Sequence, residues 1–431
     1  MPIPPSPLLT GEVRDVACPF CGLVCDDLVI ETSGTRLTVL ANGCPLAALG
    51  FEGDPGAGKA VARVGGRAVT VTAAVAAAAR LLCDAKQPVI AGLGTDVAGI
   101  RAASQLAEHA GAVVDHMNSA AAMRNLLVLQ DSGWITTTLS EVRNHADLLI
   151  VAGTDIACRM PRFFERCIGN RETLFSGERR CDVVYVGRGP GEGAPSGADT
   201  SIIECDVTRM HEGFSALRAL VGGRTIGAPA AAGVPLGRWR ELAERCRAAR
   251  YGVIAWMAAD LDFPQADLTV QGICELVRDL NRHTRFAGLP LGGSDGDVTA
   301  DAVLLWQTGF GLRSSLAGGS PDHDAYHYSA ERMVMRGEAD CLLWVSSFNA
   351  ARTPPVSSVP TVVLGRADMA LTQEPAVFIA VGTPGVEHAG HLFRTDRVVA
   401  LPLLALRESS LPSTAQVLAA IDAAMQDVSP C

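Results

Sequence analysis

A chain of 431 residues, 48% of them hydrophobic, is too long for one simple core and predicts two or three domains built around large buried sheets. Its net charge of −10 argues against a nucleic-acid partner, because phosphate contacts need clustered Lys and Arg. No apolar run approaches the roughly 20 residues that span a bilayer, and the Pro-rich first residues do not resemble a signal peptide. We therefore expect a cytoplasmic protein with no membrane partner.

The most specific pattern is a group of four cysteines near the start of the chain. Cys18, Cys21 and Cys25 form a CxxCxxxC motif, and Cys44 follows after eighteen intervening residues. The short spacings fold three thiols around one corner, so all four can converge on one metal centre. A close group with a distant fourth thiol is more typical of a [4Fe-4S] cluster than of zinc, which more often takes two separated CxxC pairs.

Short strand-like runs at 27–31 and 36–40 predict a small domain around these cysteines. From residue 69 onward, apolar runs alternate with helical patterns, which predicts a parallel sheet covered on both faces. The predicted strands are 88–94, 112–115, 147–152, 182–186, 201–204, 252–257, 286–291, 341–345, 361–364, 377–381 and 398–401. The predicted helices are an alanine-rich one that ends at Leu82, then 97–111, 265–281 and 413–425.

The two halves of the chain resemble each other. Segment 146–154 is followed by 181–188, and segment 339–347 by 360–366, each pair reading as two buried strands with a helix between them. The predicted fold class is therefore α/β, with a small N-terminal Cys-rich domain and two Rossmann-like parallel-sheet lobes. A Gly, Ala and Pro-rich passage at 222–237 suggests a boundary, and interleaved lobes remain an open alternative. The predicted domains are 1–60, 61–236 and 237–431.

Several weaker motifs favour structural roles. Residues 53–60 imitate a phosphate-binding P-loop, but Ala60 stands where a Ser or Thr hydroxyl would hold Mg²⁺. The glycine-rich segment 187–193 follows a strand, yet its proline would break the helix that a dinucleotide loop must open. The pairs His323 with His327 and His388 with His391 have metal-compatible spacings but lack a neighbouring carboxylate or thiol in a convincing pattern. We expect these segments to be loops.

The cysteine segment 18–27 resembles the opening of the B subunit of formylmethanofuran dehydrogenase, a family related to the molybdopterin and tungstopterin oxidoreductases. Segment 127–147 is similar to the next characteristic stretch of that family. Later matches are 298–301 with 305–309, and 382–387 with 393–396. The matches occur in order and span most of the chain.

The departures from this family matter for function. In its catalytic members, the resemblance implies a metal-ligating Cys followed by a His just before segment 127–147. Those places fall near Ala121 and Ala122, and no Cys or His occurs between His116 and His145. An active-site Arg and a nearby His should precede Val298, where this chain has Gly292 and its neighbours. We therefore expect no catalytic residue at these positions and no molybdenum- or tungsten-pterin cofactor.

A B subunit without its redox centre resembles the corresponding subunit of the bacterial formyltransferase/hydrolase complex. The resemblance implies a non-catalytic scaffold in tetrahydromethanopterin-linked one-carbon metabolism, from formaldehyde to formate. Its implied partners are a formyltransferase subunit, an amidohydrolase-like hydrolase subunit and a further structural subunit. The alternative is an active molybdenum- or tungsten-pterin formylmethanofuran or formate dehydrogenase subunit. In the scaffold, the four cysteines either hold a [4Fe-4S] cluster or zinc, or are vestigial thiols without metal.

Overall fold

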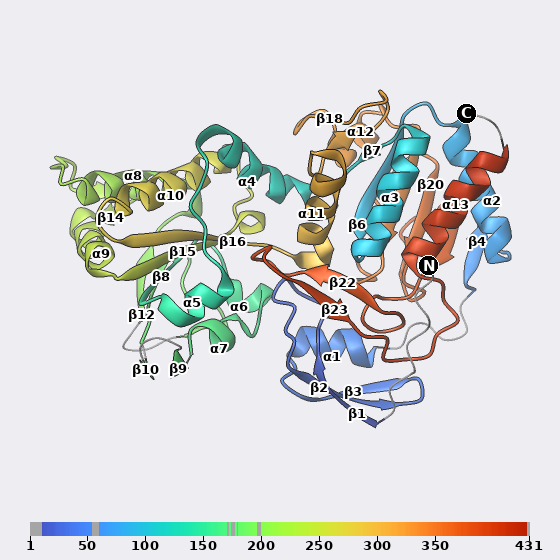
Figure 1. Ribbon diagram of the computed structural model, residues 1–431. Coiled ribbons are helices and arrows are strands. Elements are labelled where there is room, and N and C mark those ends of the chain that lie inside the picture. Colours follow the sequence, from blue (N-terminus) through green and yellow to red (C-terminus); the bar gives the residue numbers. More distant parts are fainter. Residues whose placement is uncertain are drawn as a thin grey trace. The chain divides into compact units, whose positions relative to one another are not determined.

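The computed structural model describes residues 11–53, 60–169, 172–173, 177–178, 180–195 and 200–428 (Figure 1). The chain divides into two compact units. Unit 1 contains Met1–Ser119 and Gly293–Cys431, and unit 2 contains Ala120–Gly292. The chain therefore leaves unit 1, builds unit 2 and returns to complete unit 1. No helix among the described residues is long and apolar enough to cross a membrane.

Unit 1 begins with a small thiol domain, residues 11–53. Its three antiparallel strands are β1 (Gly11–Val16), β2 (Leu28–Ser33) and β3 (Arg36–Ala41), followed by helix α1 (Pro45–Glu52). Leu28, Ile30 and Leu37 are almost completely buried, so alternate residues of β2 supply the small core. Both strands predicted between the cysteines are confirmed.

The main sheet of unit 1 has nine strands, in the order β18-β17-β7-β6-β19-β20-β21-β4-β5. They are β4 (Ala62–Val64), β5 (Arg67–Ala68), β6 (Pro88–Gly94), β7 (Val113–Val114), β17 (Ser314–Ser315), β18 (Asp322–His323), β19 (Cys341–Ser346), β20 (Thr361–Gly365) and β21 (Val377–Ala380). The five middle strands, from β7 to β21, run parallel. Their strand order reverses between β6 and β19, which makes this pair the topological switch point where open α/β sheets bind ligands.

Helices and one hairpin complete unit 1. They are α2 (Val71–Asp84), α3 (Val97–Ala110), α11 (Asp297–Thr308), α12 (Ala330–Met335), α13 (Thr414–Val428), and the hairpin of β22 (Gly390–Phe393) and β23 (Ala400–Leu403). Helices α2, α3 and α13 pack together as one layer (Figure 1). Met333 of α12 packs with alternate sheet residues such as Val89 and Leu342, so the strands are buried and read as continuous apolar runs.

Unit 2 contains a five-stranded sheet that is parallel throughout, in the order β12-β11-β8-β15-β16. The strands are β8 (Leu148–Ala152), β11 (Asp182–Gly187), β12 (Thr200–Glu204), β15 (Tyr251–Met257) and β16 (Arg285–Leu291). In chain order this is 3-2-1-4-5, the Rossmann arrangement, with its switch point between β8 and β15.

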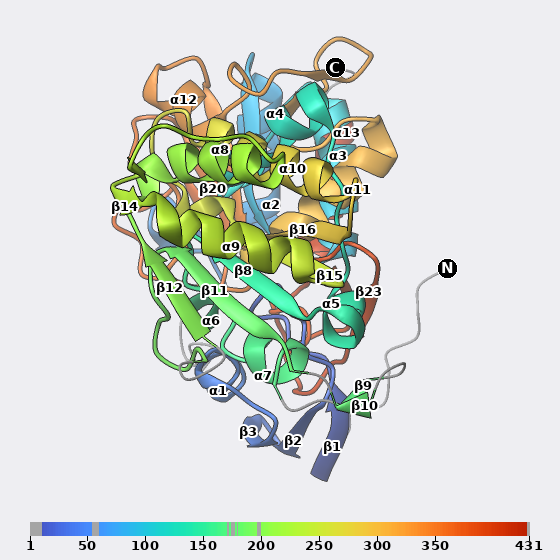
Figure 2. The ribbon, with the colours of Figure 1, turned by 90° about the vertical axis from the view of Figure 1, so that its left-hand side faces the viewer.

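The helices and short hairpins of unit 2 surround this sheet. They are α4 (Ser119–Ser132), α5 (Leu139–His145), α6 (Ile156–Arg159), α7 (Phe163–Cys167), α8 (Met210–Val221), α9 (Leu236–Ala248) and α10 (Ala266–Leu280), with β9 (Glu172–Thr173), β10 (Gly177–Glu178), β13 (Ala230–Ala231) and β14 (Val234–Pro235). Figure 2 shows α8, α9 and α10 lying over the sheet. Phe214, Trp239 and Ile273 from these helices are completely buried in one core cluster with the strands.

The predicted fold class is confirmed, because both repeated segment pairs form neighbouring parallel strands. β8 pairs with β11 in unit 2, and β19 pairs with β20 in unit 1. The boundary predicted between residues 236 and 237 falls inside unit 2, because β8 and β15 on either side of it share one sheet. The strand predicted at 398–401 forms β23 at Ala400–Leu403, in an antiparallel hairpin rather than in the parallel sheet.

A buried ion pair fastens the thiol domain to the rest of unit 1. The Arg407 guanidinium lies 2.5 Å from the Glu387 carboxylate, and both side chains are at least 96% buried. Arg407 also donates to the carbonyl oxygens of Thr35 and Gly53, each at 3.3 Å, while Glu387 accepts from the Thr383 N–H at 2.7 Å. The pair is therefore fully hydrogen-bonded, the condition under which a buried ion pair is tolerated.

Arg407→Met should lower the free energy of unfolding by about 3–5 kcal/mol, because it leaves the Glu387 carboxylate buried without its cation. Chemical denaturation with fluorescence detection measures this change. Arg397→Met is the matched control, since Arg397 is half exposed and pairs with Asp301 on the surface of the same unit. We expect a change below about 1 kcal/mol for the control. Equal losses in the two variants would contradict this role of Arg407.

Candidate functional site

The four predicted metal-ligating cysteines lie in the thiol domain. Cys18, Cys21 and Cys25 occupy the turn after β1, which is closed by a hydrogen bond from the Cys18 N–H to the Cys25 carbonyl oxygen at 2.8 Å. Cys44 is the N-cap residue of α1. The fold of this small domain thus brings the two parts of the motif together.

The first three thiols are buried, and Cys44 is partly buried. Burial, together with the charges that Cys25 and Cys44 would carry, raises the pKa of Cys21 to about 12. The same causes, with Cys21 as the strongest neighbour, raise the pKa of Cys18. The four thiols are therefore electrostatic neighbours, and the raised pKa values of Cys18 and Cys21 keep these two thiols protonated near pH 7. In the described part of the chain, no three His, Cys, Asp or Glu side chains are already arranged as metal ligands.

Close packing holds the thiol loop against the main part of unit 1. Gly293 has φ +93°, and a Cβ atom on it would lie 2.5 Å from the Gly22 Cα atom. The Gly22 carbonyl oxygen accepts a hydrogen bond from the Thr395 N–H at 2.8 Å. Val24 joins a buried cluster with Phe348 of the segment after β19. The loop is thereby fixed beside the residues that follow the carboxyl ends of the strands.

At the switch point of unit 1, a side chain of the protein accepts hydrogen bonds from the free N–H groups at the start of helix α3. The Asp96 side chain caps α3 by accepting from the N–H groups of Gly99 at 3.1 Å and Ala98 at 3.4 Å. A Cβ atom on Gly390 would lie 2.6 Å from an Asp96 carboxylate oxygen, so the hairpin of β22 and β23 covers this cap. An anionic ligand at the N-terminus of α3 would have to displace a side chain of the protein.

The same edge carries a buried polar cluster that sequence patterns did not reveal. The His116 Nε2 atom lies 3.2 Å from the Asp295 carbonyl oxygen, and its Nδ1 atom accepts from the Asn118 N–H at 2.9 Å. The Asp295 carboxylate pairs with Arg352 at 3.1 Å. Burial lowers the pKa of His116 to about 3, so the imidazole is neutral near pH 7. These residues come from segments distant in the sequence, and no spacing links them.

At the switch point of unit 2, side chains again pair with one another. The Thr154 hydroxyl donates to the Asp260 carboxylate at 2.5 Å, and the Arg159 Nε–H donates to the same carboxylate at 2.8 Å. Arg124 of α4 donates to the Ala258 carbonyl oxygen at 2.8 Å and pairs with Asp262. Helix α4 is therefore attached to the carboxyl end of β15.

The attachment of α4 also locates the residues that we expect at the positions of the family's catalytic groups. Ala121 and Ala122 lie on α4, one turn before Arg124, and both are partly buried. Gly292 directly follows β16 in the same unit. All three residues belong to the part of unit 2 that adjoins the carboxyl ends of its strands, and their side chains offer no metal ligand, acid or base.

The expectation that the weaker motifs form loops is wrong for His323 and His391, which lie in strands β18 and β22. Residues 54–59 of the segment that imitates a P-loop are not described. In the glycine-rich segment 187–193, the Gly191 backbone packs on the Asp155 carboxylate, which would repel a phosphate. His327 pairs with Asp324 at 2.8 Å, His323 stacks on Phe310, and His388 bonds to backbone oxygens.

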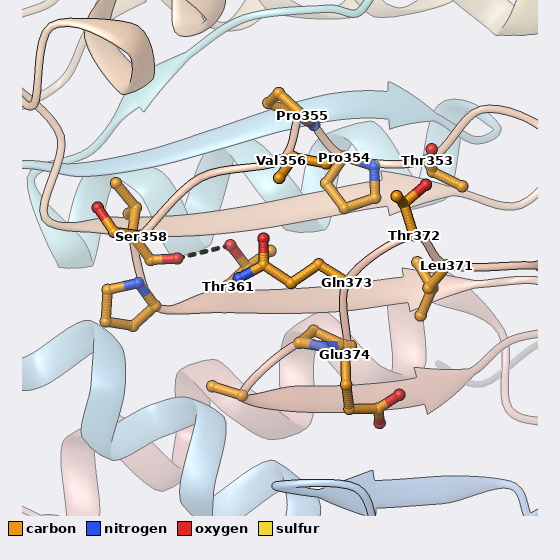
Figure 3. A pocket seen from close by; sticks show the side chains of 14 residues that line it. Thr353, Pro354, Pro355, Val356, Ser358, Thr361, Leu371, Thr372, Gln373 and Glu374 are labelled. Carbon is orange, nitrogen blue, oxygen red and sulfur yellow. Dashed lines mark hydrogen bonds between the residues drawn. The ribbon is translucent and has the colours of Figure 1, made fainter.

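A pocket of about 140 Å³ lies at the opposite, amino ends of β20 and β21 (Figure 3). Prolines and aliphatic side chains make up much of its lining, and the Thr361 hydroxyl there donates to the Val359 carbonyl oxygen at 2.9 Å. Its one charged side chain, Glu374, is paired with Arg63 at 2.9 Å. This pocket has no free acid, base or nucleophile of its own.

Comparisons with known proteins agree with this architecture, although no protein-family model matches the chain. The B subunit of the tungsten-containing formylmethanofuran dehydrogenase 2 of Methanocaldococcus jannaschii is 28% identical over 399 residues, covering 90% of this chain and 92% of the relative. The B subunit of the formyltransferase/hydrolase complex of Methylorubrum extorquens is 30% identical over 367 residues, covering 81% and 91%.

A solved structure supports the same relationship. A chain in the crystal structure of the Methylorubrum extorquens formyltransferase/hydrolase complex, determined with methylofuran, superposes with a TM-score of 0.72 and 28% identity. The match covers 85% of this chain and all of that chain. This chain belongs to the family of B subunits of formylmethanofuran dehydrogenases and formyltransferase/hydrolase complexes.

Proposed function

We propose that this chain is a non-catalytic B subunit that acts as a cytoplasmic scaffold in a formyltransferase/hydrolase complex. The observation that carries the proposal is the pair Ala121 and Ala122 on α4, beside the strand ends of unit 2, where catalytic relatives are expected to place a metal-ligating Cys and a His. Methyl groups bind neither molybdenum nor tungsten, so a pterin-bound metal has no side-chain ligand here. The described residues do not fit such a cofactor.

The self-paired strand ends support the same proposal. Asp96 occupies the N-terminus of α3, Asp295 pairs with Arg352, and Asp260 pairs with Arg159. Ligand sites of open α/β sheets normally expose such groups to the ligand. Here the protein's own carboxylates bind these groups. A fold that keeps its strand ends but binds no cofactor needs such internal partners.

Within such a complex, the chemistry belongs to the partners. The proposed partners are a formyltransferase subunit, an amidohydrolase-like hydrolase subunit and a further structural subunit. They would transfer a formyl group from a tetrahydromethanopterin carrier to a furan-type carrier and hydrolyse it to formate. The related B subunit of Methylorubrum extorquens belongs to a complex of this name.

We also propose that Cys18, Cys21, Cys25 and Cys44 hold a structural metal centre. The four thiols are the donor type that a [4Fe-4S] cluster and zinc both take, and they are electrostatic neighbours in one small domain. Metal binding would have to draw them into a ligand arrangement that they do not have without it. Binding would require their deprotonation, which a bound cation favours. A [4Fe-4S] cluster or zinc would cross-link the turn after β1 to the start of α1. This cross-link would stabilise the thiol domain, because the domain has little apolar core of its own.

Native purification of the tagged full chain from its own cells should recover the formyltransferase and hydrolase subunits in constant ratio, identified by mass spectrometry. The physical reason is that a scaffold without catalytic groups acts only through stable contacts. An unrelated protein with the same tag is the control. Recovery of this chain as a stable monomer without those subunits would contradict the scaffold role.

The second candidate is an active molybdenum- or tungsten-pterin dehydrogenase, which the similarity to a tungsten-containing relative favours. Elemental analysis of the native preparation separates the two candidates. We expect molybdenum and tungsten far below one atom per chain, because Ala121 and Ala122 offer no ligand. A stoichiometric amount of either metal would overturn the scaffold proposal.

The same analysis tests the thiol site. We expect either about one zinc or about four irons per chain, the content of the two alternative centres. Cys21→Ser should remove most of this metal and lower the Tm, whereas Cys158→Ser, which alters an exposed thiol in unit 2, should change neither. A metal-free native chain, or metal content unaffected by Cys21→Ser, would leave the four thiols as vestigial.

A further inference from the structure

A cavity of about 410 Å³ in unit 2 has a positively charged lining. It lies beside the last turns of α8 and α10, two helices that pack against each other (Figure 2). Its polar lining consists of Ser215, Arg218, Arg224, Asp279, Arg282 and His283. Three arginines thus accompany one carboxylate, a local excess of positive charge in a chain whose net charge is −10.

Ion pairs with α10 hold two of these arginines in place. The Arg218 Nε–H donates to one Asp279 oxygen at 3.0 Å, and another N–H of the same guanidinium donates to Glu275. The Arg282 guanidinium lies 3.5 Å from the other Asp279 oxygen. Glu275 is not a lining residue, and it also pairs with Arg278 at 3.8 Å. Two guanidinium groups are therefore fixed beside the cavity, and the carboxylate that fixes them has a cation at each oxygen.

The two other basic side chains of the lining have no partner within the chain. Arg224 follows the end of α8, and His283 follows the end of α10. Neither side chain makes a hydrogen bond or an ion pair in the part of the chain that the structure describes. Both residues are exposed, so a ligand in the cavity can bind them without breaking an existing contact.

Helix capping does not account for these two unpaired side chains. Basic residues often lie at the end of a helix, because they hydrogen-bond its last carbonyl groups and interact favourably with its dipole. Here Arg247 of α9 donates to the carbonyl oxygens of Leu220 and Val221, the last residues of α8. At the end of α10, the Asn281 side chain donates to the Val277 carbonyl oxygen at 2.8 Å. Both helix ends therefore have other donors.

We propose that this cavity binds a phosphate group, held by Arg218, Arg224 and Arg282. A guanidinium presents its N–H groups in a planar fork that matches phosphate oxygens, and the Ser215 hydroxyl and the His283 ring add further donors. The cavity volume falls within the range of about 300–1,000 Å³ that is typical of sites for whole small molecules. We therefore expect a phosphate monoester rather than free phosphate. The inference concerns unit 2 and does not rest on the scaffold role.

Isothermal titration calorimetry of the purified full chain with glycerol 3-phosphate tests this site, and we expect saturable binding. Arg224→Met should weaken the binding by about tenfold or more, because a charge-assisted hydrogen bond is lost. The Tm of this variant without ligand should equal that of the wild type, since the Arg224 side chain has no partner in the chain. Arg238→Met is the matched control: it removes an exposed arginine of α9 that pairs with Glu241 at 3.9 Å, and it should leave the affinity unchanged.

Two further ligands identify the group that is bound. Inorganic phosphate should bind more weakly than glycerol 3-phosphate if the site takes a monoester, whereas equal affinities would assign free phosphate; either result supports a phosphate site. Glycerol, which lacks the phosphate group, should not bind. If neither phosphate compound binds to the wild type, or if Arg224→Met binds them as tightly as Arg238→Met does, the proposal is wrong.

Discussion

The close approach of the Gly22 and Gly293 backbones is the contact on which the arrangement of unit 1 depends. Any side chain at Gly293 would collide with Gly22, and its φ of +93° already restricts the position to glycine. This one contact sets the thiol loop against the loop that covers the switch point between β6 and β19. The two features that define the site, the thiols and the self-bound Asp295, therefore form one continuous structure in this unit.

For the scaffold role that we propose, this structure suggests how the family's fold persists without catalytic groups. Parallel sheets leave helix N-termini and strand ends at one edge, and buried polar groups there need partners whether or not a ligand is present. In this chain Asp96, Asp260 and Asp295 provide those partners. In each unit, polar groups at the carboxyl ends of the strands therefore have partners within the chain.

The sequence predicted the sheets well and the site only in part. Strands such as β6, β8 and β19 are buried on both faces, so each appears as an uninterrupted apolar run bounded by turn residues. The division into units was predicted less well, because it depends on strand pairing between β8 and β15 across a glycine-rich passage. Helix α4 was not predicted at all, since its apolar and polar residues lack a clear helical pattern.

The pairing of Asp295 with Arg352 could not be predicted from sequence patterns. Neither residue belongs to a motif, and the contact exists only because a loop with three positive φ angles turns the carboxylate toward the strand ends. Ala121 can be read directly from the sequence, but the contacts that satisfy the polar groups at the strand ends cannot. In the scaffold that we propose, the decisive residues are those that hydrogen-bond the buried polar groups at the strand ends, and these are found by tracing hydrogen bonds rather than sequence patterns.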